Sequence, residues 1–149
     1  VEAEQHEGTS LVEILQNCVI FNDKVFSEYT AKENKDDAIL YVEDGQPMIF
    51  GKEKNKGLIL KGFELEIVTI GENGITEKDI LVHDAKNSNP TLHFMLVRME
   101  YPIVAGVIRS VDSEPYEKRL EKQVLEVEQK SQFKTIDDLL LSGETWEIV

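Results

Sequence analysis

The sequence predicts a mixed fold of α-helices and β-strands, in which central strands and short helices are followed by a long amphipathic helix and a C-terminal tail. Two observations support this prediction. Between residues 38 and 71, short apolar runs alternate with turn signals, which is typical of sheet structure. From Pro115 onward the apolar residues instead recur at helical spacing, and the opposite face carries Glu, Lys and Arg. The pattern therefore changes near residue 113.

The central strands are expected in five apolar runs, which cover residues 38–43, 47–51, 57–60, 63–70 and 103–111. In the fourth run, the apolar side chains at positions 63, 65 and 67 point one way, and positions 64, 66 and 68 point the other. Such alternation indicates a sheet with one half-exposed face, which favours antiparallel pairing.

A further strand is predicted at the N-terminal side, in the run SLVEIL from Ser10 to Leu15. The run is short, apolar and partly β-branched, which fits a buried strand better than a helix of ordinary length. This strand would deliver Cys18 to its C-terminal end, where sites in α/β proteins tend to lie. After it, Val25, Phe26 and Tyr29 stand at helical spacing and predict one short helix and then a charged loop.

Three further helical segments are predicted. Thr76 and Asp79 have the spacing of a capped short turn. The run 91–99 places apolar residues at helical spacing and predicts an amphipathic helix. Beyond the long helix that starts after Pro115, Thr135 is a capping signal for the run LLL, and a strand-like TWEIV with the sole Trp closes the chain. This apolar tail either folds back on the body or packs on a partner.

Size and charge limit the functions that the chain can have. With 149 residues, of which 41% are hydrophobic, the chain has the size of one domain with a real core. Its 29 acidic and 16 basic residues give a formal charge of −13, which would repel phosphate backbones and anionic lipid and so argues against nucleic acid as a partner. No run approaches the ~20 apolar residues of a membrane span, and no signal peptide is evident, so a cytoplasmic protein is expected. The first residue is Val1, which hints at a fragment.

The single cysteine limits metal chemistry. One cysteine permits neither an internal disulfide nor a self-contained cluster site, which needs about four ligands. If Cys18 binds a metal, its co-ligands lie on another segment or chain; the alternative is that Cys18 is a small buried hydrophobe. His6, His83 and His93 lack the spacing of metal ligands, and His83 and Asp84, as neighbours on a strand, would point to opposite faces. No phosphate-cradle or nucleophile-elbow motif is present, so no catalytic or cofactor-binding residue is assigned.

Five short sequence blocks, taken in their order along the chain, nevertheless resemble those of a known family. They are HEGTSLVEILQNCVIFN (6–22), DG-x-P-x-x-FG (44–51), ILVHD (80–84), YP-x-x-x-GV-x-R (101–109) and the closing LLLSGETWEIV. In this order, the blocks resemble the C-terminal part of the thiamine-diphosphate-binding β subunit of 2-oxoacid:ferredoxin oxidoreductases, of which 2-oxoglutarate:ferredoxin oxidoreductase is one. The resemblance covers nearly the whole chain.

The resemblance implies a role for Cys18 as the fourth ligand of an iron-sulfur cluster in the intact enzyme. The other three cysteines of the family, and its site for thiamine diphosphate and Mg²⁺, lie upstream of the matching region and have no counterpart in this sequence. The isolated chain is therefore expected to carry no cofactor and to be inactive. The intact enzyme would convert 2-oxoglutarate or a related 2-oxoacid and coenzyme A to acyl-CoA and CO₂, with electrons passed to ferredoxin.

The resemblance also suggests an organisation. Residues 1–112 would be the C-terminal portion of the thiamine-diphosphate-binding type of subunit, and residues 113–149 a helical tail that docks on a partner. The expected partners are the α subunit of the same enzyme and ferredoxin, and a homodimer of the chain is also open. Two alternatives remain: a free-standing interaction module without chemistry, and an unrelated acidic, β-rich binding domain.

Overall fold

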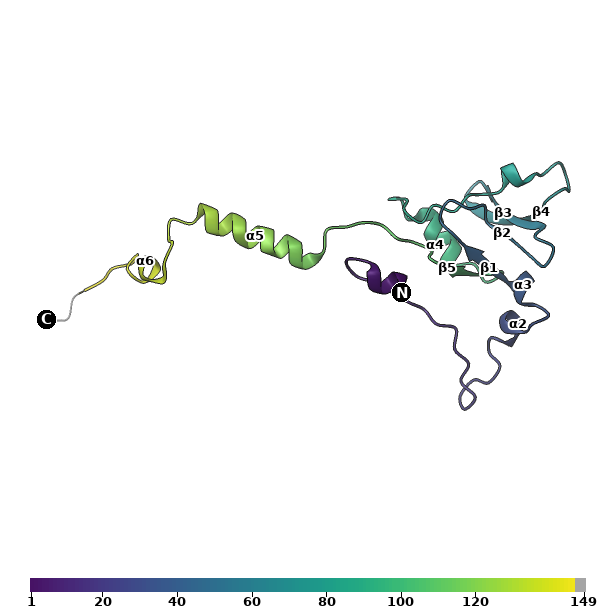
Figure 1. The fold of residues 1–149 in the computed structure, drawn as a ribbon, viewed down its shortest axis with the longest axis horizontal. Helices are drawn as coiled ribbons and strands as arrows, with labels where there is room; N and C mark the ends of the chain where they lie inside the picture. The colour runs from purple at the N-terminus through teal and green to yellow at the C-terminus, as the bar shows by residue number, and fades with distance from the viewer. Residues whose placement is uncertain (147–149) are drawn as a thin grey trace. The chain divides into compact units, whose positions relative to one another are not determined.

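A computed structural model describes residues 1–146 and shows helices together with parallel and antiparallel sheets, so the mixed α and β fold class is confirmed (Figure 1). Contacts divide the chain into two units: residues 13–112, and residues 1–12 together with the chain from Ser113 onward. The helices and strands of the first unit are α2 (Ser27–Thr30), α3 (Lys35–Ala38), β1 (Ile39–Val42), β2 (Ile49–Phe50), β3 (Lys56–Lys61), β4 (Glu64–Thr69), η1 (Glu77–Asp79), α4 (Thr91–Val97) and β5 (Ile103–Gly106).

Residues 13–112 contain two small sheets. Strands β2, β3 and β4 form an antiparallel sheet in that order, and β3 pairs with β4 from Lys56 opposite Thr69 to Lys61 opposite Glu64. The predicted antiparallel, half-exposed sheet is thereby confirmed. Strands β1 and β5 form a parallel pair, with Val42 opposite Gly106. Strand β5 is shorter than the predicted run 103–111, because it ends at Gly106, whose φ of +110° leaves the extended region.

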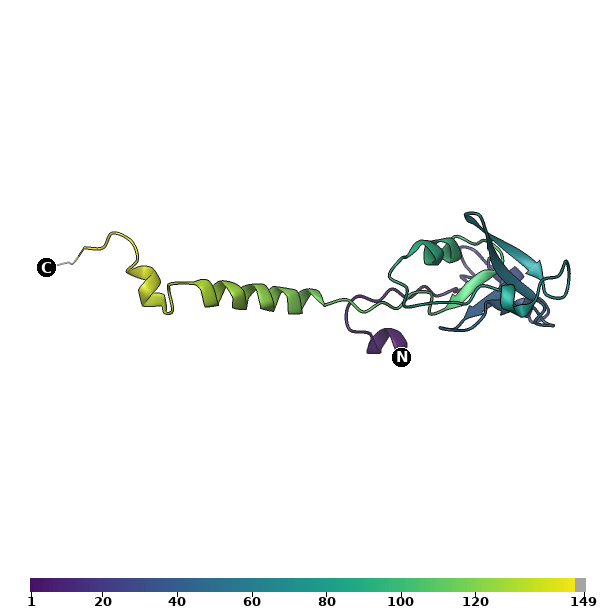
Figure 2. The same ribbon diagram turned by 90° about the horizontal axis from the view of Figure 1, so that it is seen from above.

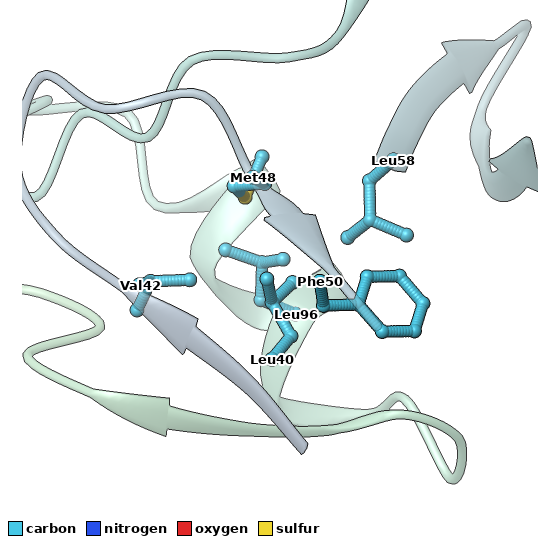
Figure 3. Packing of buried hydrophobic residues seen from close by; sticks show 6 residues of the cluster. All are labelled: Leu40, Val42, Met48, Phe50, Leu58 and Leu96. Atoms are coloured by element: carbon cyan, nitrogen blue, oxygen red, sulfur yellow. The ribbon is translucent and has the colours of Figure 1, made fainter. Parts of the chain in front are cut away.

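The core lies where strands of both sheets meet α4 (Figure 3). Its buried apolar residues come from β1, β2, β3, α4 and the segment before β2, namely Leu40, Val42, Met48, Phe50, Leu58 and Leu96. Helix α4 contributes Leu96 from the apolar stripe that the sequence predicts for 91–99. One ordinary hydrophobic core thus holds the central part of the chain.

The second unit contains α1 (Glu2–Gln5), α5 (Tyr116–Lys130) and α6 (Ile136–Leu140). Helix α5 confirms the long helix predicted after Pro115, and the Thr135 hydroxyl accepts a hydrogen bond from the backbone N–H of Asp138 as the predicted cap of α6. The apolar side chains of α5 and α6 are exposed in this structure. Of the predicted terminal strand, residues 147–149 lie outside the described residues, while Thr145 and Trp146 form no strand.

The predicted strand at Ser10–Leu15 is wrong for this structure. Figures 1 and 2 draw this segment as plain coil, and residues 10–15 are exposed throughout. A strand needs a neighbour to satisfy its backbone N–H and C=O groups, and among residues 1–146 the structure pairs this segment with none. The local preference for extended structure is present, but the sheet that would fix it is not.

An ion pair between helix α3 and strand β3 gives a pH-dependent prediction. The Lys56 ammonium donates a 2.7 Å hydrogen bond to Asp37 Oδ1, and this bond holds the pKa of the Asp37 carboxyl below its ordinary value. Because the folded-state pKa lies below the unfolded one, the pair stabilises the protein above about pH 4 and ceases to do so as pH falls through the folded pKa. Both side chains are about one third exposed, so the effect is modest.

We expect Asp37→Asn to lower the urea midpoint at neutral pH slightly and to flatten its fall between about pH 5 and pH 2. Urea unfolding followed by circular dichroism across this range measures both effects. The neighbouring Asp36→Asn variant is the matched control, because the Asp36 carboxylate makes no hydrogen bond to any residue in the described part of the chain. A wild-type slope in Asp37→Asn would contradict the prediction.

Candidate functional site

The sole cysteine lies at the surface, in a loop made of residues 17–24 that we call the Cys18 loop. Its side chain is exposed, so the interpretation of Cys18 as a small buried hydrophobe is wrong. The structure thus presents the chain's single thiol to solvent.

The Cys18 loop is closed by its own hydrogen bonds. The backbone N–H of Asn22 donates to the carbonyl of Cys18 at 2.9 Å. The Asn17 side chain connects the two ends of the loop, because its amide donates to Asp23 Oδ1 at 3.0 Å and its carbonyl accepts from the Lys24 backbone N–H at 2.7 Å. Lys24 adopts a left-handed φ of +60°, which turns the chain toward α2. The sequence marks Asn17 as tolerant of turns, but only the structure shows it joining both ends of the loop.

The backbone around Cys18 favours its thiolate. Hydrogen bonds from Phe21, then Ile20 and to a smaller extent Asn22 lower the pKa of the Cys18 thiol below its ordinary value. Such bonds stabilise the thiolate, which is the form of cysteine that attacks electrophiles and binds metals. Bonds of the same kind, to the sulfurs of a cluster, also tune the reduction potential of iron-sulfur centres. The loop therefore fits a metal-binding thiolate.

This geometry predicts a measurable reactivity. In the folded chain, alkylation of Cys18 by iodoacetamide should show its pH midpoint below that of the same chain in about 6 M guanidinium chloride, because the native thiolate forms at lower pH. Mass spectrometry of the alkylated fraction against pH gives both midpoints. Ile20→Pro removes one N–H donor and should raise the native midpoint, whereas identical native and denatured midpoints in the wild type would contradict the prediction.

The chain contains a single cysteine thiol. Within residues 1–146, no three His, Cys, Asp or Glu side chains gather in a way that could hold a metal ion. Iron-sulfur clusters are held by about four ligands, mainly cysteine thiolates, so Cys18 fits such a centre only together with ligands outside this chain. For thiamine diphosphate the sequence provides no glycine-rich phosphate cradle, and no residue here is matched to it.

His83 and His93 lie close together, although the sequence separates them. Their ring centroids are 6.1 Å apart and nearly perpendicular, and both rings are buried. Each Nε2 lies near a backbone carbonyl oxygen, of Val107 at 2.9 Å and of Asp84 at 2.8 Å. A carbonyl only accepts, so both Nε2 atoms carry the hydrogen. The pair joins the segment around residue 83 to α4 and to the chain after β5.

The sequence did not indicate that His83 is buried. His83 is fully buried and Asp84 is exposed, so the two do point to opposite faces as predicted. The signal that was missed is local: His83 follows the apolar run ILV, and His93 stands three residues before Leu96, on the buried face of α4. Both rings are buried, which suits a packing role.

Among residues 1–146, no helix is both long enough and apolar enough to cross a bilayer.

Comparison with known proteins gives one informative match. The chain is 32% identical over 152 aligned residues to the 2-oxoglutarate oxidoreductase subunit KorB of Mycobacterium tuberculosis (strain ATCC 25618 / H37Rv). The alignment covers 98% of this chain and 40% of the relative, so the chain spans about two fifths of that subunit's length. No family model matches the chain. No solved structure gives a significant match either. The resemblance inferred from the sequence is confirmed to this extent: over nearly its whole length, the chain is similar to part of this 2-oxoglutarate oxidoreductase subunit.

Proposed function

We propose that the chain works as part of the β subunit of a 2-oxoacid:ferredoxin oxidoreductase, in which Cys18 is one ligand of an iron-sulfur cluster completed by residues outside this chain. The observation that supports the proposal most directly is the exposed Cys18 thiol, held in a closed loop with backbone N–H groups directed at its sulfur. The similarity to KorB agrees with it. The substrate would be 2-oxoglutarate or a closely related 2-oxoacid, which the enzyme would convert with coenzyme A to acyl-CoA and CO₂.

The chain's own contribution is to hold and tune one thiolate. The bonds that Asn17 makes to Asp23 and Lys24 fix the shape of the loop before any metal binds, which lowers the entropy lost on ligation. The N–H groups of Phe21 and Ile20 stabilise the negative charge of the sulfur and lower the pKa of the Cys18 thiol. A cluster bound there would carry electrons from the oxidised 2-oxoacid toward ferredoxin.

The helical tail would serve assembly. We assign residues 113–149 to docking on the α subunit, since α5 and α6 carry exposed apolar side chains that a monomeric soluble protein rarely leaves uncovered together; they are Tyr116, Leu120, Val124, Leu125, Val127, Ile136, Leu139, Leu140 and Leu141. The same observation favours the second candidate, a free-standing interaction module without chemistry. The two candidates differ in whether the assembled protein binds an iron-sulfur cluster.

Iron and acid-labile sulfide distinguish the two candidates. After anaerobic reconstitution, the isolated 149-residue chain should bind neither in stoichiometric amount, because one thiolate does not hold a cluster. The enzyme assembled with its other parts should bind both. Stoichiometric iron and sulfide on the isolated chain, or none on the assembled enzyme, would contradict the proposal, and the second result would favour the interaction module.

The gene provides an independent check. If the chain belongs to such a β subunit, sequencing the reading frame upstream of the Val1 codon should reveal further cysteines and the G-D-G stretch around which the thiamine diphosphate and Mg²⁺ site of the resembled family is built. A start codon immediately before Val1, with no separate gene for those elements beside it, would support the interaction module instead.

A further inference from the structure

Strand β4 leaves one edge of the antiparallel sheet open. The strand order is β2, β3 and β4, so β4 pairs with β3 on one side and with no strand of residues 1–146 on the other (Figure 1). With six residues, β4 is longer than β1, β2 or β5. An open strand edge presents a row of backbone N–H and C=O groups with which a further strand can pair.

The register shows which residues of β4 direct their backbone groups outward. The N–H of Ile70 donates a hydrogen bond to the carbonyl of Asn55, and hydrogen-bonded residues alternate along an antiparallel pair. The even-numbered residues of β4 therefore bond to β3, whereas Leu65, Ile67 and Thr69 direct their N–H and C=O groups to the open edge. Within the described part of the chain, no backbone group outside β3 pairs with β4 here.

This edge lacks the features by which proteins usually prevent pairing. β4 contains no Pro and no Lys, and its register with β3 runs without a bulge. Ile67, near the middle of the edge, is β-branched and 43% exposed. Of the two glutamates on the strand, Glu66 lies 3.1 Å from the Lys61 ammonium of β3, which offsets its charge.

Two copies of β4 could pair about a twofold axis in several registers. In such an antiparallel pair, the residue at the centre lies opposite its own copy. Centring on Leu65 would place Glu64 opposite Glu66, and centring on Glu66 would place that residue opposite itself. Like charges directly opposite each other destabilise a strand pair. Centring on Val68 would leave only residues 67–69 of β4 paired with one another.

Centring on Ile67 avoids both problems. In this register Glu66 lies opposite Val68, and Glu64 lies opposite Ile70, so no glutamate faces another. Residues 65–69 all pair within β4, and the outward N–H and C=O groups of one copy meet those of the other. The exposed Ile67 side chain meets its own copy as an apolar cross-strand pair. The edge is thus complementary to itself in this register.

We propose that the open edge of β4 binds the same edge of a second copy of this chain, in the antiparallel register centred on Ile67. The two three-stranded sheets then form one sheet of six strands. This inference goes beyond the proposed function and does not depend on Cys18. The interface is small, so the dimer should dissociate with a Kd of about 100 μM. The charge of −13 on each copy opposes association, but about 0.15 M salt screens charges more than about 8 Å apart.

Sedimentation velocity of the 149-residue chain, between about 5 and about 500 μM in about 0.15 M salt, tests the association. The sedimentation coefficient should rise with concentration from that of a monomer toward that of a dimer. In hydrogen-deuterium exchange, the amides of Leu65, Ile67 and Thr69 should exchange about threefold more slowly at the highest concentration than at the lowest. A monomer at every concentration, or a dimer in which these amides gain no protection, would overturn the proposal.

Substitutions at the centre of the register localise the contact. Ile67→Lys places two ammonium groups opposite each other and should raise the dimer Kd at least about tenfold. Leu60→Lys is the matched control, because Leu60 is 49% exposed but lies on β3, away from the open edge, and its Kd should stay within about twofold of wild type. A circular dichroism spectrum like that of the wild type checks that each variant is folded.

A charge swap tests the register itself. Ile67→Glu should weaken the dimer as Ile67→Lys does, because it too places like charges opposite each other. An equimolar mixture of the two variants should dimerise at least as well as the wild type, since each ammonium then faces a carboxylate. A dimer that survives Ile67→Lys would place the contact elsewhere, for example on the apolar face of α5. That result, or a mixture that stays monomeric, would overturn the proposal.

Discussion

In an assembled enzyme that contains this chain, Cys18→Ala is expected to lower the rate of ferredoxin reduction at least about 100-fold. Removing a residue that only supports a metal ligand already costs about 10- to 100-fold in metal affinity or activity, so losing the ligand itself should cost more. Alanine keeps the Cβ atom of the cysteine and removes only its sulfur. Because Cys18 is exposed and outside the core, the fold of residues 13–112 should be retained.

The measurement is ferredoxin reduction with the 2-oxoacid and coenzyme A, accompanied by iron content per enzyme. Val25→Ala, a small change seven residues later and outside the Cys18 loop, serves as the control that should keep both near wild type. If Cys18→Ala kept full iron content and full ferredoxin reduction, Cys18 would not be a cluster ligand. A loss of both with an unchanged circular dichroism spectrum would support the assignment.

Gly106→Ala is expected to destabilise residues 13–112 by about 3 kcal/mol or more. A non-glycine residue in a sparsely populated backbone region costs about 1–3 kcal/mol, and Gly106 has a φ of +110°. A steric term adds to this, since a Cβ at Gly106 would lie 2.5 Å from the carbonyl oxygen of Val42, its partner on β1. That neighbour is backbone within a paired strand, so it cannot move aside without opening the β1–β5 pair.

Gly62→Ala separates the two costs. Gly62 also has a positive φ, of +64°, but a Cβ there meets no atom within 4 Å. Its substitution should therefore cost only the backbone term, about 1–2 kcal/mol. Urea unfolding of both variants gives the difference, and equal losses of stability in the two would show that the contact with Val42 contributes nothing.

Much of the fold of residues 38–106 could be predicted from the sequence. Period-2 alternation located β4, apolar runs located β1 and β3, and the helical stripe located α4, because each of these patterns reflects burial on one face of a local element. The parallel pairing of β1 with β5 could not be predicted in this way. The two strands are about 60 residues apart, and no local pattern specifies which distant strand completes a sheet.

For the candidate site, too, the sequence predicted some features and not others. The sequence identified Cys18 as the chain's only cysteine, and the turn-forming character of Asn17 and Asn22 was evident from their residue type. The exposure of Cys18 and the N–H groups directed at its sulfur depend on how residues 18–22 turn back on themselves, which only coordinates reveal. Likewise, the burial of His83 against His93 depends on α4 packing over a segment ten residues earlier.

The sequence by itself determined the class of fold, most helices and strands of the central body, the family resemblance and the presence of a single cysteine. Each of these follows from local patterns or from the order of short motifs. The tertiary structure decided what stays uncovered. A strand exists only when a neighbour pairs with it, so SLVEIL, which the sequence predicts as a strand, is exposed coil in this structure.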